Sequence, residues 1–109
     1  MKKPDSLPQA TLELLLMRLL RSTPLNGWEM MQRITLVSGE VLTVTPGSLY
    51  PALHRLEAAG FIGAEWSTSE NNRRAKYYHL TARGRRELAT ERESWERFVG
   101  AVGAILNEG

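Results

Sequence analysis

The sequence contains no cysteine among its 109 residues. A disulfide scaffold, a thiolate zinc site and thiol catalysis are therefore excluded. The two histidines, His54 and His79, are isolated, and neither belongs to a His-x-x-x-His pair or a His/Asp cluster that would suit a metal ion. Asp5 is the only aspartate, so a hydrolase triad lacks support. We expect a protein that is not an enzyme and that holds no metal or cofactor.

Long apolar runs are also missing. The apolar stretch that follows Pro4 is interrupted by Glu13 and Arg18, which makes it too short and too charged for a signal peptide or a membrane span. We therefore expect a cytoplasmic protein without a membrane segment, and the lack of cysteine fits a reducing compartment.

Charge is divided unevenly along the chain, although the formal net charge is only +2. Residues 43–86 hold seven Lys or Arg against three Glu, whereas residues 87–109 hold two Arg against five Glu. A basic middle followed by an acidic end predicts one surface that faces a polyanion and a separate surface for another partner.

A helix with marked ends is predicted at about residues 45–60. Pro46 suits the first helical position, where its missing N–H would have been unpaired in any case, and the Thr45 hydroxyl can cap the helix. Gly60 suits the left-handed residue that ends a helix. Leucines spaced by four and three residues define the apolar face, namely Leu49, Leu53 and Leu56.

The rest of this predicted helix is short, polar and aromatic. It comprises Ser48, Tyr50, Pro51, His54 and Arg55. Pro51 deletes a backbone hydrogen bond if the helix begins at Pro46, but it falls in the first turn if Ser48 is the cap, so we expect an irregular first turn. The helix is either an ordinary amphipathic helix or one that is presented to a nucleic-acid groove.

Two further helices are predicted before it. A capping box of Ser6 and Gln9 opens the first, at about 7–21, and its apolar stripe comprises Leu12, Leu15, Leu16, Leu19 and Leu20. Asn26 caps the second, at about 27–37. Its buried face is expected to comprise Met30, Met31, Ile34 and either Leu36 or Val37.

Strand-forming segments surround the third predicted helix. Residues 41–44 are β-prone, and residues 61–67 and 76–80 are expected to form a hairpin with a polar, basic tip at 69–74. Lys76 and Tyr78 should share one face of the hairpin while Tyr77 faces the other, so one of the two tyrosines belongs to the core.

Three helices, a short strand and a hairpin predict a mainly α, α+β fold, the winged helix-turn-helix domain. In such domains the third helix enters the major groove of double-stranded DNA, and the hairpin lies along the backbone or over the minor groove. Arg73 and Arg74 at the hairpin tip can reach phosphates or a narrow minor groove.

Several runs of the chain resemble the PadR family of bacterial transcriptional regulators. They are residues 49–62, Glu65-Trp66, residues 72–78 and residues 80–84. The resemblance implies a homodimeric DNA-binding repressor, commonly relieved by a ligand or an environmental signal. The residues that inherit DNA contacts by this resemblance are Ser48, Tyr50 and His54 on the helix, and Asn72, Arg73, Arg74 and Lys76 on the wing. The start of the second helix, residues 26–29, departs from the family pattern.

A last helix is predicted from Ala82 to Asn107, capped by Thr81 and longer than a winged domain needs. Its wide apolar stripe predicts a dimer interface with the same helix of a second subunit. The interface residues are Leu88, Trp95, Phe98, Val99, Val102, Ile105 and Leu106. We therefore divide the chain into a DNA-binding domain, 1–81, and a dimerisation helix, 82–109, within one compact unit.

Trp95 resembles a tryptophan of drug-responsive PadR-type regulators that faces its symmetry mate. It either fills the interface, which the following Phe98 and Val99 favour, or leaves a slot for a small aromatic effector. Two alternatives to a repressor of an inverted-repeat operator stay open, a winged-helix protein-interaction module and a small-molecule sensor.

Overall fold

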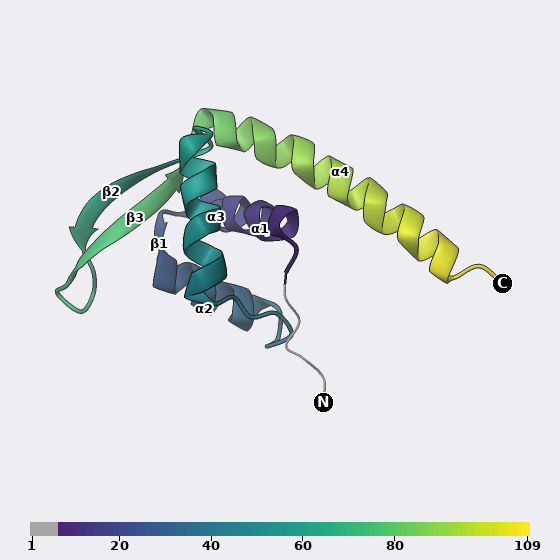
Figure 1. Cartoon of the computed structure of the whole chain (residues 1–109), viewed down its shortest axis with the longest axis horizontal. Coiled ribbons are helices and arrows are strands. Elements are labelled where there is room, and N and C mark those ends of the chain that lie inside the picture. Colours follow the sequence, from purple (N-terminus) through teal and green to yellow (C-terminus); the bar gives the residue numbers. More distant parts are fainter. Residues whose placement is uncertain (1–6) are drawn as a thin grey trace.

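The fold is built around α1, as the computed structural model of residues 7–109 shows (Figure 1). The elements are α1 (Gln9–Ser22), β1 (Leu25–Asn26), α2 (Gly27–Val37), α3 (Pro46–Ala58), β2 (Ile62–Thr68), β3 (Arg74–Leu80) and α4 (Ala82–Leu106). α1 contacts all three other helices and β3. The Leu16 side chain of α1 is fully buried, together with leucines of α3 and Met30 of α2. The predicted mainly α, winged helix-turn-helix fold is confirmed.

The sheet has three antiparallel strands in the order β1-β3-β2. The prediction that residues 41–44 form its short strand is wrong, because Leu25 and Asn26 pair with Tyr78 and Tyr77 and occupy that edge of β3. Residues 41–44 lie outside any strand, and Leu42 and Val44 pack against the core instead. β-propensity alone does not make this segment a strand, because β1 already occupies that edge of β3.

α1 begins at Gln9, about two residues later than predicted, and Pro8 precedes it without a side-chain cap. The predicted capping box depends on Ser6, which lies outside the described residues. Within the leucine stripe, Leu12, Leu16 and Leu20 are buried as predicted. Leu15 and Leu19 are half-buried at its margins.

α2 begins with the predicted Asn26 cap, which Glu29 completes as a capping box. The Glu29 N–H donates to Asn26 Oδ1 at 2.8 Å, and the Asn26 N–H donates to Glu29 Oε1 at 2.9 Å. Departure from the family pattern at residues 26–29 therefore leaves the helix start intact. The predicted burial of Leu36 or Val37 is wrong, because both lie in the last turn beyond the core, with Leu36 72% exposed.

α3 runs continuously from Pro46, so Pro51 lies inside it and leaves one backbone carbonyl of the first turn without an N–H partner. Thr45 precedes the helix, but its side chain makes no capping hydrogen bond. Gly60 has a φ of 82°, the left-handed conformation expected where the helix stops.

Thr81 ties the end of α3 to the start of α4. Its hydroxyl donates to the Gly60 carbonyl at 2.7 Å and accepts from the Gly84 N–H at 3.0 Å. The Thr81 N–H donates to the Phe61 carbonyl at 3.1 Å. One residue therefore fixes the direction in which α4 leaves the sheet.

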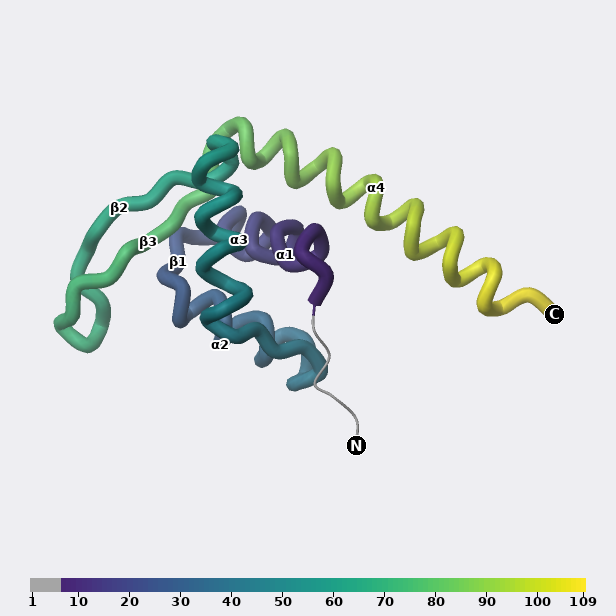
Figure 2. Tube along the Cα trace, viewed as in Figure 1, coloured from purple at the N-terminus to yellow at the C-terminus, as the bar shows by residue number. Residues whose placement is uncertain are grey.

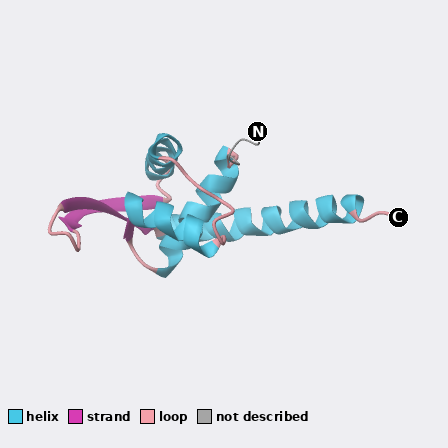
Figure 3. Ribbon diagram, turned by 90° about the horizontal axis from the view of Figure 1, so that it is seen from below, coloured by secondary structure: helices cyan, strands magenta, loops and turns pink. Residues whose placement is uncertain are grey.

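α4 leaves the winged core after its first turns, as the trace in Figure 2 shows. The helix packs against α1 and ends at Leu106. The wing and the free end of α4 lie at opposite ends of the molecule (Figure 3), whose longest dimension is 56 Å.

Candidate nucleic-acid interface

The exposed side of α3 carries the residues that the sequence assigned to DNA. Ser48, Tyr50 and His54 are exposed, whereas the buried residues of the helix are Leu49, Ala52, Leu53 and Leu56. Burying one face of a short helix against α1 leaves the opposite face free at the surface. Three of the predicted contact residues are therefore accessible on α3.

Arg55 does not join this face, although the sequence pattern placed it there. Its Nε donates to Glu13 Oε2 of α1 at 2.7 Å, across 42 positions of sequence. The side chain is directed to α1 by this charge-assisted hydrogen bond. Arg55 therefore links α3 to α1, while its side chain remains 40% exposed.

Tyr50 lies where α3 approaches the start of α2. A Cβ built on Gly27 would lie 2.5 Å from the Tyr50 hydroxyl oxygen, so a larger residue at this position would displace the tyrosine ring. The ring packs on the N-terminal end of α2, yet the residue is still 46% exposed. Packing fixes the ring and leaves its edge accessible, so a structural role and a binding role are compatible.

The wing tip is a tight polar turn between β2 and β3. The Ser69 N–H donates to the Arg73 carbonyl at 2.7 Å, and the Asn72 N–H donates to the Ser69 carbonyl at 2.9 Å. Asn72 has a φ of 58°, a left-handed conformation that asparagine tolerates better than most residues. The turn thus accounts for an asparagine at position 72. The same turn exposes Arg73 at the tip.

Lys76 belongs to the wing, but its side chain lies close to α3. Its Nζ lies 3.4 Å from Glu57 Oε1 of α3 and 5.5 Å from the centroid of the Tyr78 ring. Lys76 and Tyr78 share one face, as predicted, and Tyr78 is the tyrosine that belongs to the core. Burial raises the pKa of Tyr78, while the neighbouring Lys76 ammonium acts to lower it.

α4 carries the apolar stripe that the sequence assigned to a dimer. Six of its predicted interface residues are exposed in the single chain, namely Trp95, Phe98, Val99, Val102, Ile105 and Leu106. Trp95 and Phe98 stack at a centroid distance of 6.0 Å. Leu88 differs from them, because it is buried in the chain's own core. The heptad pattern cannot separate these two kinds of apolar residue, since both follow the same spacing.

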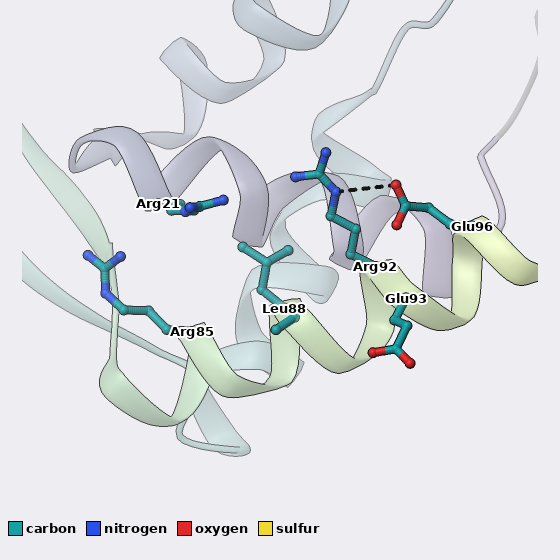
Figure 4. A pocket seen from close by; sticks show the side chains of 7 residues that line it. Arg21, Arg85, Leu88, Arg92, Glu93 and Glu96 are labelled. Atoms are coloured by element: carbon teal, nitrogen blue, oxygen red, sulfur yellow. Dashed lines mark ion pairs between the residues drawn. The ribbon is translucent and has the colours of Figure 1, made fainter.

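Open grooves lie between α1 and α4. One of about 250 Å³ contains Trp95 and Phe98, with Leu14 of α1 on its other side. A larger one, of about 500 Å³, contains Leu88 and three arginines, Arg21, Arg85 and Arg92 (Figure 4). Arg92 lies 3.8 Å from Glu96 there. The smaller groove lies on the side of α4 that carries the exposed stripe.

The sequence model of the transcriptional regulator PadR-like family matches residues 15–90, which include α3, the wing and the start of α4. The chain belongs to this family. It is therefore a PadR-like transcriptional regulator and not an enzyme. None of the helices within residues 7–109 combines the length and the apolar character that crossing a membrane requires.

Relatives of this PadR-like regulator agree with the assignment. The chain is 39% identical over 59 residues to the transcriptional regulator Rv3488 of Mycobacterium tuberculosis, a match that covers 54% of each protein, so it spans about half the length of that relative. A PadR-like transcription factor of Bacteroides fragilis is 31% identical, with a TM-score of 0.73 and coverage of 89% and 91% of the two chains. A PadR family transcriptional regulator of Eggerthella lenta is 27% identical, with a TM-score of 0.78 and coverage of 93% and 86%.

One exposed residue of the wing was assigned no role from the sequence. Trp66 of β2 is 58% exposed, and the Arg74 guanidinium carbon lies 4.9 Å from the centroid of its ring. The sequence offered one signal for this residue, an aromatic side chain toward the far end of a predicted strand. α3 and the wing thus bring together the predicted residues Ser48, Tyr50 and His54, and Arg74 and Lys76, on neighbouring elements.

Proposed function

We propose that this regulator binds double-stranded DNA as a homodimer and represses transcription at an inverted-repeat operator. The observation that carries the proposal is the exposed polar face of α3 beside a cationic wing. In a winged helix-turn-helix domain these two elements approach the major groove and the backbone, respectively. The division into a DNA-binding domain, 1–81, and a dimerisation helix, 82–109, belongs to the same proposal.

Ser48, Tyr50 and His54 are proposed to contact the major groove and the phosphates beside it. Hydroxyl and imidazole groups can donate to or accept from base edges, which differ between base pairs in the major groove. Asn72, Arg73, Arg74 and Lys76 of the wing are proposed to bind phosphates, which position a protein on DNA without reading its sequence.

Dimerisation through α4 is supported by the six exposed apolar residues on its second half. Phe98 is 60% exposed and Ile105 is 73% exposed in the single chain. A contiguous apolar stripe of this kind marks a protein interface. A second copy of α4 is complementary to the first by two-fold symmetry, and this arrangement presents two copies of α3 to one duplex.

A footprint of the purified protein on its own promoter tests the DNA proposal. The expected site is an inverted repeat whose half-sites lie about one helical turn apart. Affinity should fall steeply between about 50 and 200 mM salt, because several phosphates are neutralised. Affinity that stays constant over this range, or protection of a single half-site, contradicts the proposal.

Substitutions can separate the roles of the wing and α3. Replacing Arg73 and Arg74 with Ala should weaken operator and random DNA by similar factors and reduce the salt dependence. Replacing Ser48 or His54 should instead reduce discrimination between the two DNAs. The reverse pattern would assign sequence reading to the wing.

Trp95 is the residue that distinguishes a plain interface from an effector site. We expect Trp95→Ala to weaken the dimer by a few kcal/mol, roughly the cost of emptying an aromatic site in a core, and to weaken operator binding with it. Sedimentation of the variant and titration of the wild type with planar aromatic dyes measure the two properties. An intact variant dimer together with saturable quenching of the wild type favours the small-molecule sensor.

A further inference from the structure

Trp66 is exposed because β2 continues past the core. The burial of one face of the strand declines along it, from the buried Ile62 through the half-buried Ala64 to the exposed Trp66. The indole therefore fills no space in the core of the chain. Exposure of a single aromatic residue is not informative by itself, so the neighbours of the ring decide its role.

Arg74 lies over that ring. The strand register pairs Trp66 with Lys76 and Thr68 with Arg74, which makes Arg74 and Trp66 diagonal neighbours on one face of the hairpin. The distance of 4.9 Å from the guanidinium carbon to the ring centroid is within the range of a cation–π contact. Among residues 7–109, none of the four ion pairs includes Arg74.

The face that carries this stack is continuous with α3. Lys76 lies on the same face, and its contact with Glu57 of α3 shows that this side of β3 adjoins the helix. A duplex that accepts α3 in its major groove therefore has its backbone next to this face. Stacking covers the flat side of a guanidinium and leaves the N–H groups at its edge free to donate to a phosphate.

We propose that Trp66 is a positioning residue of the DNA interface, holding the Arg74 guanidinium with its N–H edge toward a backbone phosphate. This inference rests on the proposed DNA-binding function. A stacked arginine has already lost part of its rotamer freedom, so less conformational entropy is lost when the phosphate binds. Arg73, exposed in the turn before β3, is the matched arginine for which the structure records no such stack.

The test measures binding to a random-sequence duplex of about 30 base pairs, because phosphate contacts do not depend on sequence. Fluorescence anisotropy between about 50 and 200 mM salt gives the affinity and its salt dependence. Trp66→Ala should weaken binding about three- to tenfold, the equivalent of ordering one arginine side chain. Trp66→Phe, which keeps a flat ring, should retain most of the affinity.

Double variants separate positioning from a general effect on the wing. In an Arg74→Ala background, Trp66→Ala should cause little further loss, whereas in an Arg73→Ala background it should cause its full loss. Ser67→Ala is the control on the opposite face of the hairpin, where Ser67 pairs with Ala75, and it should leave affinity unchanged. The wild type should change its tryptophan emission when DNA is added, and Trp66→Phe should reduce that change.

Two results overturn the inference while leaving the DNA-binding proposal intact. Wild-type affinity of Trp66→Ala, alongside a weakened Arg74→Ala, means that the stack does not position the arginine. Equal losses from Trp66→Ala in the Arg73→Ala and Arg74→Ala backgrounds mean that the indole acts independently of Arg74. A wild-type protein that binds no duplex at the lowest salt overturns the DNA-binding proposal itself, and the inference with it.

Discussion

The two parts of α4 belong to one continuous helix but have different surroundings. In its first turns Gly84 and Leu88 are buried, and a Cβ added to Gly84 would collide with the Phe61 carbonyl oxygen. Along its second half no residue is buried, and a Cβ added to Gly100 or Gly103 would meet no atom within 4 Å. One helix therefore closes the core of its own chain and then offers an apolar surface to another molecule.

The second half of α4 gains little stability from contacts within its own chain. Its charged residues form two ion pairs one helical turn apart, Arg92 with Glu96 at 3.8 Å and Arg97 with Glu93 at 2.9 Å. Such exposed pairs contribute about 0.3–0.5 kcal/mol each, which is small beside the burial of one large apolar side chain. The difference between the two halves teaches that the first contributes to the stability of the chain, and the second is the half that we propose for association.

The largest effect is expected from breaking the core. Leu53→Ala, at a position 1% exposed, should reduce the free energy of unfolding by about 2–5 kcal/mol through lost burial and a cavity. Ile105→Ala should instead shift the dimer toward monomer, because Ile105 is exposed in the single chain. Denaturant unfolding at two protein concentrations and sedimentation measure the two effects. A loss for Ile105→Ala that resembles that of Leu53→Ala and is independent of concentration contradicts the comparison.

Alanine substitutions at two glycines of α4 should have intermediate effects on stability, and these effects should be opposite in sign. Gly84→Ala should destabilise the chain by about 1–3 kcal/mol, because the new methyl group forces the Phe61 carbonyl to move. Gly100→Ala has open space around it and should stabilise the helix by about 0.5–1 kcal/mol. Thermal unfolding of the two variants tests this. If Gly100→Ala yields a monomer, Gly100 lies at a close contact between helices.

The smallest effect concerns Glu87, near the boundary between the two parts. Burial first, and then a hydrogen bond with Glu91, raises the pKa of the Glu87 carboxyl. A raised pKa in the folded state means that stability is highest at low pH and falls as pH increases through and above its ordinary value of 4.5. Glu87→Gln should therefore stabilise the protein at neutral pH by about 0.2–0.5 kcal/mol, as expected for removing a like-charge pair at i,i+4.

This gain should disappear at about pH 3, where the carboxyl group is protonated in both states. Glu93→Gln is the control, because Glu93 pairs with Arg97 at 2.9 Å and its neutralisation should cost a few tenths of a kcal/mol at neutral pH. Thermal unfolding at the two pH values distinguishes them. A gain for Glu87→Gln that persists at low pH would show that it has another cause.

Much of the candidate interface could be predicted because its signals are local. The position of Pro46 and Gly60, and the spacing of the leucines between them, were sufficient to define α3 and its exposed face. Trp66 received no role, because an aromatic residue in a strand is compatible with a core position as well as a surface one. Only the length of the strand beyond the core showed that its ring is exposed.

The sequence by itself determined the helices, the hairpin and their order, because caps, turns and side-chain periodicity act over a few residues. The Asn26 and Thr81 caps formed as predicted, and Glu29 completed a capping box with Asn26. Tertiary structure alone decided which strand completes the sheet, that Arg55 binds Glu13, and that Leu88 belongs to the core. These outcomes depend on segments that are distant in sequence and meet only when the chain packs, so no local pattern could specify them.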